Sequence, residues 1–200
     1  MNALAAGEAF FALGVTVFST LTLLLFNPRS GGVRWYALFQ LCIAAWLFAQ
    51  GMGFATGDWD TWRPLMSGAV HLSPGFFLAF ALLQTVRSLP AALAAMGLGF
   101  ALLPLDQRSL TGPFAEPLLA TWTIGGWMLG TALFVRIMRR EPRTTAAERR
   151  LGRTLLLGIV MVMPIGIVSS VLTRGALGIY VMPLAMVWIQ LLLFVGVARL

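Results

Sequence analysis

The sequence contains no lysine, one histidine and one cysteine, and each of these scarcities excludes a class of site. The lack of lysine excludes a Schiff-base cofactor such as retinal, because that bond needs a lysine amine. The single cysteine, Cys42, excludes a disulfide within the chain. Cys42 and the single histidine, His71, are too few ligands for a zinc cluster or for a bis-histidine haem within one chain.

Charge is also scarce, and hydrophobic residues take its place. Of 200 residues 10% are charged and 59% are hydrophobic, and the mean hydropathy is +0.87. A soluble domain has about 25% charged residues. The composition therefore indicates one integral membrane domain covering residues 1–200. It should be all-α, because a helix satisfies its own backbone hydrogen bonds in lipid.

Seven uncharged stretches each have the length of a membrane span, which is about 20 residues for a hydrocarbon core of about 30 Å. We expect seven transmembrane helices, at approximately residues 6–27, 35–56, 64–86, 89–105, 117–137, 145–173 and 176–198. Single arginines, Arg87 and Arg174, separate two pairs of helices. Joining either pair would give a helix of roughly 60 Å, so both pairs should be tight hairpins. The first helix lacks the positive start of a signal peptide and should be retained.

The arginines predict the orientation of the bundle. In a seven-helix topology, the first, third and fifth loops and the C-terminus share one side, which holds 11 of the 14 arginines. Positive loops stay in the cytoplasm. The N-terminus should therefore lie outside and the C-terminus inside.

The longest segment between two of the uncharged stretches, residues 136–153, is rich in arginine. Its basic residues are Arg136, Arg139, Arg140, Arg143, Arg149, Arg150 and Arg153. Such a cluster attracts anionic lipids by about 1 kcal/mol per charge, and its simpler role is to mark the cytoplasmic side. Thr145–Glu148 (TAAE) has the form of a capping box, so helix six should project into the cytoplasm and offer a docking surface for a partner.

His71 is the candidate for ligand or proton sensing. It lies seven residues inside the outer end of helix three, roughly 10 Å deep, and ionisable groups at such depth are often functional. Pro74 frees a backbone carbonyl that a nearby side chain can bond. A neutral, hydrogen-bonded packing histidine is the simpler interpretation, and ligation of a single pigment or haem by His71 is a third. Trp122 is the second candidate sensing residue.

Other intramembrane polar residues, Thr123 among them, are expected to bond neighbouring helices, and Gly126–Gly130 (GWMLG) is a GxxxG motif that permits close helix contact. No serine-protease elbow or HExxH motif is present, and no aspartate or glutamate falls within the seven uncharged stretches, the first of which begins at residue 9. The sequence therefore predicts a protein that is not an enzyme. The same lack of acids argues against coupled ion transport.

Several short motifs lie along the chain in a recognisable order. They are NPRS at Asn27–Ser30, Trp46, Trp62-Arg63, LSP at Leu72–Pro74, Phe80, ERR at Glu148–Arg150 and GIYVMP at Gly178–Pro183. From about Phe26 to Leu200 the chain resembles the seven-helix N-terminal sensor region of bacterial histidine kinases. The resemblance implies a bacterial inner-membrane location and a sensory function. It assigns no ligand residue.

Members of that family continue into a dimerising phosphoacceptor helix pair and an ATP-binding domain, whereas this sequence stops at Leu200. The first hypothesis is therefore a sensory input module that binds a lipid-like or small apolar ligand near His71 and Trp122 and signals through helices six and seven to a partner. The second is an accessory subunit of a larger respiratory or photosynthetic membrane complex. The third is a small transporter.

Overall fold

The computed structural model describes residues 2–26, 28, 31–106 and 115–140 and six separate positions nearer the C-terminus. These six are Arg153, Leu157, Pro183, Val187, Trp188 and Leu191. The elements are α1 (Ala3–Phe26), α2 (Gly31–Thr56), α3 (Trp59–Thr85), α4 (Leu89–Leu102), the 3-10 turn η1 (Leu103–Asp106) and α5 (Ala115–Arg140). The part of the chain that is described contains no strand.

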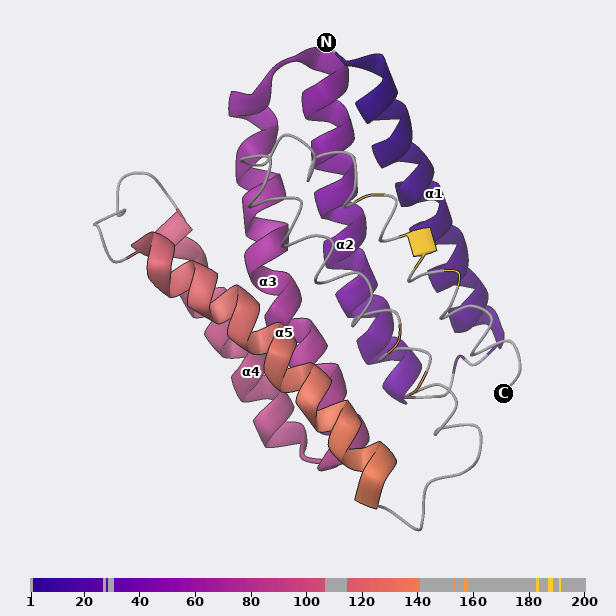
Figure 1. Cartoon of the computed structure of the whole chain (residues 1–200), viewed down its shortest axis with the longest axis vertical. Helices are drawn as coiled ribbons and strands as arrows, with labels where there is room; N and C mark the ends of the chain where they lie inside the picture. The colour runs from indigo at the N-terminus through magenta and orange to yellow at the C-terminus, as the bar shows by residue number, and fades with distance from the viewer. Residues whose placement is uncertain are drawn as a thin grey trace.

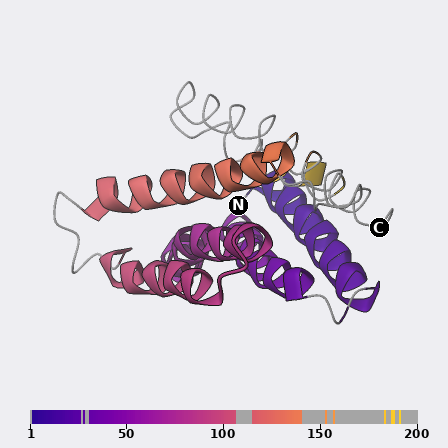
Figure 2. The ribbon, with the colours of Figure 1, turned by 90° about the horizontal axis from the view of Figure 1, so that it is seen from below.

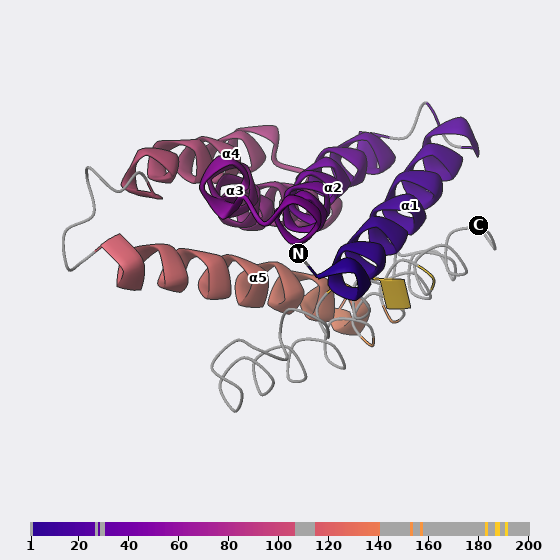
Figure 3. The ribbon, with the colours of Figure 1, turned by 90° about the horizontal axis from the view of Figure 1, so that it is seen from above.

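The helices alternate in direction, with α1, α3 and α5 running from the upper to the lower end of Figure 1 and α2 and α4 running back. Viewed from either end, α4, α3, α2 and α1 follow one another, and α5 lies across the face of α3 (Figures 2 and 3). Helix α3 contacts α2, α4 and α5, whereas α1 packs mainly on α2. Helix α3 is therefore the centre of the described bundle.

Local side-chain contacts set the ends of α3 and α4. Asp58 caps α3 by accepting a hydrogen bond from the Thr61 backbone N–H, and Ser88 caps α4 in the same way from the Ala91 N–H. Between these helices the N–H groups of Val86 and Arg87 both donate to the Leu82 carbonyl, which ends α3. The hairpin expected at Arg87 is thus confirmed.

The helices extend past the boundaries set by charge in the sequence. Helix α1 begins at Ala3, and α3 begins at Trp59 rather than near residue 64. Charged side chains are compatible with a helix, so cutting the chain at each charge shortened the elements. Glu8, which precedes the first uncharged stretch, lies within α1, a helix long and apolar enough to span a membrane.

Glu8 places a carboxylate within α1. Its side chain is half-buried, and its Oε2 atom is buried without a hydrogen-bond partner. Because α1 contains this carboxylate, a lack of acids no longer argues against coupled ion transport.

Aromatic side chains from three helices form the core. Phe39 of α2 lies 5.5 Å from Phe77 of α3 and 5.3 Å from Trp127 of α5, measured between ring centroids. The Phe77 and Trp127 rings stack at 4.6 Å. The buried Tyr36 hydroxyl accepts a hydrogen bond from Gln40 one turn along α2, which satisfies both groups within the core.

The outward faces of the bundle are apolar, as expected for a membrane protein. Phe11, Phe18 and Leu25 on α1 are at least 60% exposed, and Met128 on α5 is 66% exposed. Helices α1, α2 and α3 are each long and apolar enough to cross a membrane, and α4 is a shorter apolar helix. The described chain is therefore an all-helical bundle of the membrane type.

Some expectations lie outside the described residues. They are the capping box at residues 145–148, the hairpin at Arg174 and the boundaries of helices six and seven. Leu157, Val187 and Trp188 are each helical where they are described.

Candidate functional site

The two candidate sensing residues meet where α3 crosses α5. The Trp122 indole N–H of α5 donates to the His71 backbone carbonyl of α3 at 2.9 Å. The next residue of α5, Thr123, places its hydroxyl 3.2 Å from His71 Nδ1. All three side chains are partly buried. A histidine, a tryptophan and a threonine distant in sequence therefore form one polar junction between two helices.

Pro74 lies one turn after His71 and explains part of the local bonding. Proline has no N–H, so the carbonyl four residues earlier, that of Val70, loses its helical partner. The Ser73 hydroxyl donates to the Val70 carbonyl at 2.9 Å. The prediction that a side chain satisfies the freed carbonyl is confirmed, and the donor is Ser73 of the same turn.

Four glycines allow the helices to approach closely at this level. A Cβ on Gly126 would lie 2.7 Å from Pro74 Cβ, and one on Gly130 would lie 2.6 Å from the Phe77 ring. The close contact expected from the GxxxG motif is thus confirmed, and its partner is α3. A Cβ on Gly75 would lie 3.0 Å from the Ala95 carbonyl oxygen of α4. Gly99 faces Gly75 across the α3–α4 contact.

The Trp122 indole covers the pair of glycines on α3 and α4. Its Cζ2 atom lies 3.5 Å from the Cβ position of Gly75 and 3.6 Å from that of Gly99. The ring thus packs on two helices while its N–H bonds to α3. The indole N–H of Trp122 is therefore used inside the bundle.

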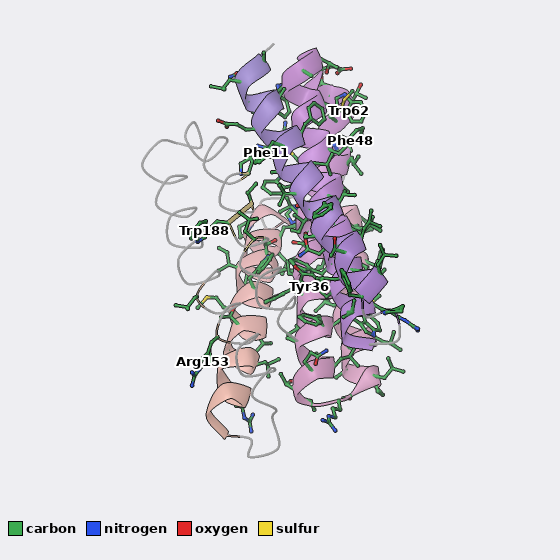
Figure 4. All side chains as sticks on the ribbon, turned by 90° about the vertical axis from the view of Figure 1, so that its right-hand side faces the viewer. Phe11, Tyr36, Phe48, Trp62, Arg153 and Trp188 are labelled. Atoms are coloured by element: carbon green, nitrogen blue, oxygen red, sulfur yellow. The ribbon has the colours of Figure 1, made fainter. Side chains whose placement is uncertain are left out.

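The arginine cluster is described in part. Arg136 and Arg153 are exposed, and the side chains of Arg139, Arg140, Arg143, Arg149 and Arg150 lie outside the described residues. Arg136 is near the lower end of α5, and Figure 4 places Arg153 toward the same end, with Trp62 toward the other. Arg34 at the start of α2 and Arg87 in the α3–α4 turn lie at this end as well (Figure 1).

The junction holds two helices together and offers groups that exchange hydrogen bonds. The histidine ring nitrogen accepts or donates according to its tautomer, and the threonine hydroxyl does both. No group of three histidine, cysteine, aspartate or glutamate residues gathers as a metal site within the described chain.

The sequence placed His71 and Trp122 beside one proposed ligand, but it predicted no contact between them and treated Pro74 and Thr123 as separate features. The pairing follows from the crossing of α3 and α5, which depends on the glycines of both helices. One signal was present: Trp122 and Thr123 precede the GxxxG motif by about one turn. They therefore lie beside the closest contact that α5 makes.

No protein-family model, curated protein or solved structure matches the chain. The function is therefore argued from the geometry of the molecule.

Proposed function

We propose that the chain is a non-enzymatic sensory input module of a bacterial inner membrane, with seven transmembrane helices. The module takes up a lipid-like or small apolar ligand beside the α3–α5 junction, and occupancy changes how the helices pack. The change passes to a protein partner at the cytoplasmic ends of the helices. A ligand of this kind acts by binding one helix arrangement more tightly than another.

The hydrogen-bonded junction of His71, Trp122 and Thr123 is the observation that carries the proposal. Polar and ionisable groups inside a membrane bundle are costly and are usually kept for a purpose. Here they meet at Pro74, the point at which α3 lacks a backbone hydrogen bond. A ligand that exchanges one of these bonds would change a contact between two helices.

The distribution of charge supports the proposed orientation. Arg34, Arg87 and Arg136 belong to the lower end of the bundle in Figure 1, whereas Glu8 and Asp58 belong to the upper end. Positive residues favour the cytoplasmic side. The lower end is thus the proposed cytoplasmic face and the surface for anionic lipids and the partner.

The test is native mass spectrometry of the full chain, purified in mild detergent from bacterial membranes. We expect one apolar molecule to remain bound to the wild-type protein and to be lost from His71→Leu. Gln84→Leu is the matched control, because Gln84 is an exposed polar residue at the other end of α3. Gln84→Leu should retain the molecule. A wild-type protein with nothing bound, or equal retention in both variants, would contradict the proposal.

The same purification addresses the second hypothesis. An accessory subunit would be recovered in fixed stoichiometry with a large membrane complex. A sensory module would be recovered alone or with one signalling partner. Recovery with a respiratory or photosynthetic complex would replace the sensory proposal.

A further inference from the structure

Helix α3 is packed unequally on the two sides of Pro74. Every residue from Ser73 to Ala81 is buried, which means that neighbours surround this part of the helix on all sides. Between Trp59 and Leu72 only Ala69 is buried. The two parts of one helix therefore differ in how firmly they are held, and the boundary between them coincides with the proline.

The inner part of α3, Ser73–Ala81, is fixed by contacts that leave no free volume. Gly126 of α5 lies against the rigid Pro74 ring, and Gly75 lies against the backbone of α4. One turn further, Phe77 is 2% exposed and stacks on Trp127. Interiors packed this closely resist continuous deformation. Movement of this part would require α4 and α5 to move with it.

The outer part of α3, Trp59–Leu72, packs on α2 through the Trp59–Phe54 and Trp62–Phe48 ring pairs, and it is joined to α5 by polar contacts at its inner end. These are the Trp122 N–H bond to the His71 carbonyl and the contact of His71 Nδ1 with Thr123. The Ser73 bond to the Val70 carbonyl stays within α3 and makes no contact with α5. The outer part is thus held to α2 by ring contacts and to α5 by hydrogen bonds, and sharp bends in helices occur mostly at proline.

We propose that the outer part of α3 pivots at Pro74 against the fixed inner part, and that the Trp122–His71 hydrogen bond is the latch that sets its position. As the means by which the module responds, this inference rests on the proposed function. The latch itself is a property of the bundle with or without a ligand. Its release would leave the inner part in place and displace the outer end of α3 together with the end of α2 that packs on Trp59.

The displacement can be sized from the helix. Trp59–Leu72 has 14 residues, which at 1.5 Å each give an arm of about 20 Å. A change of bend of about 20°, the size of a sharp kink, moves the far end of that arm by about 7 Å. Pulsed electron–electron double resonance between spin labels resolves a shift of this size.

The experiment uses the full chain in vesicles, in a Cys42→Ala background because Cys42 is the one cysteine and is buried. The outer pair of labels is at Asp60 and Met128, and the inner pair is at Gln84 and Met128. All three labelled positions are exposed. Met128 lies between the glycines that hold α5 to the inner part, so it is a fixed reference.

Trp122→Phe removes the N–H donor and keeps an aromatic ring. We expect the outer-pair distance to shift or broaden by several ångströms while the inner-pair distance stays unchanged. Trp127→Phe is the matched control, because Trp127 lies in the same helix and stacks on the inner part of α3. Trp127→Phe should leave the outer pair unchanged. An unmoved outer pair in Trp122→Phe, or an equal shift in the control, would overturn the latch.

Two further variants locate the pivot. Pro74→Ala restores the N–H donor to α3, and in that background Trp122→Phe should no longer move the outer pair. A shift that persists without Pro74 would place the pivot elsewhere and overturn the inference. Thr123→Val removes the hydroxyl at His71 Nδ1 and should shift the outer pair in the same direction, which serves as the measurement if Trp122→Phe does not fold.

The outcome is separable from that of the proposed function. A shift in Trp122→Phe with no molecule bound to the wild-type protein would support the latch and remove the sensory role. A molecule bound to the wild-type protein with no shift in Trp122→Phe would support the sensory role and overturn the latch.

Discussion

Gly126→Ala tests the closest helix contact of the structure. The added Cβ would lie 2.7 Å from Pro74 Cβ, whereas carbon atoms prefer a separation of about 3.5–4.0 Å. The overlap is with a proline ring that is part of the α3 backbone and cannot rotate away. Overpacking of this kind costs about 1–3 kcal/mol.

Gly125→Ala is the control that separates overlap from helix propensity. Alanine favours a helix over glycine by about 1 kcal/mol at either position. Nothing lies within 4 Å of a Cβ on the exposed Gly125. The propensity term therefore cancels in the comparison. We expect Gly126→Ala to be less stable than Gly125→Ala by about 1–3 kcal/mol.

The assay is reversible unfolding in mixed micelles, followed by circular dichroism and by Trp fluorescence. Equal stability of the two variants would refute the close packing of α5 on Pro74, and with it the fixed inner part of α3.

Gly51→Ala adds a graded comparison. Its Cβ would lie 2.9 Å from the ring of Phe10, but Phe10 is 36% exposed and can turn aside. The loss of stability at Gly51 should therefore be smaller than at Gly126.

Three other predictions concern the turns and the core. Arg87 has φ of 53°, a left-handed conformation that costs a non-glycine residue about 1–2 kcal/mol, so Arg87→Gly should raise the unfolding free energy by about 1 kcal/mol, and an unchanged midpoint would contradict this. Hydrogen bonds from the Thr61 side chain and backbone lower the pKa of Asp58, so its contribution to stability is present above the pKa of an unfolded aspartate, about 3.9, and is lost as the pH falls through the lower folded value. Asp58→Asn, which keeps a capping oxygen, should remove this part of the acid dependence, and a melting curve that keeps it would contradict the assignment. Cys42 is buried, so a water-soluble maleimide should label it only after unfolding, and rapid labelling of the folded protein would refute its position.

The sequence predicted the helices better than their ends. Long apolar segments allow few alternatives to a helix in lipid, which is why the first five helices are found near their expected positions. The ends failed where charge was used as a boundary, as at Arg63, because α3 begins at Trp59 and continues past that charged side chain. Capping residues indicate the start of α4 better than charge does, since Ser88 caps this helix and Pro90 lies in its first turn.

The site was predicted as a set of residues and not as a contact. His71 and Pro74 share one helix, so their spacing alone predicted a freed carbonyl near a histidine. That spacing could not predict the hydrogen bond from Trp122, because the rotation of α5 about its axis depends on packing against α3. The glycines at 126 and 130 mark the face that packs, and a GxxxG motif alone does not name the helix it meets.

The difference between the two parts of α3 follows from side-chain size as much as from the proline. The inner part, from Ser73 to Ala81, is covered by bulky aromatic rings and faces glycines on α4 and α5, so the helices lie close and bury it on every side. The outer part carries Pro64 and the exposed Asp60 and Arg63, and its tryptophans, Trp59 and Trp62, pack their rings on α2. A helix that is fully enclosed at one end and sparsely held at the other bends at the weakest step between them. In α3 that step is Pro74, one turn after the polar contacts of His71 with Trp122 and Thr123 of α5.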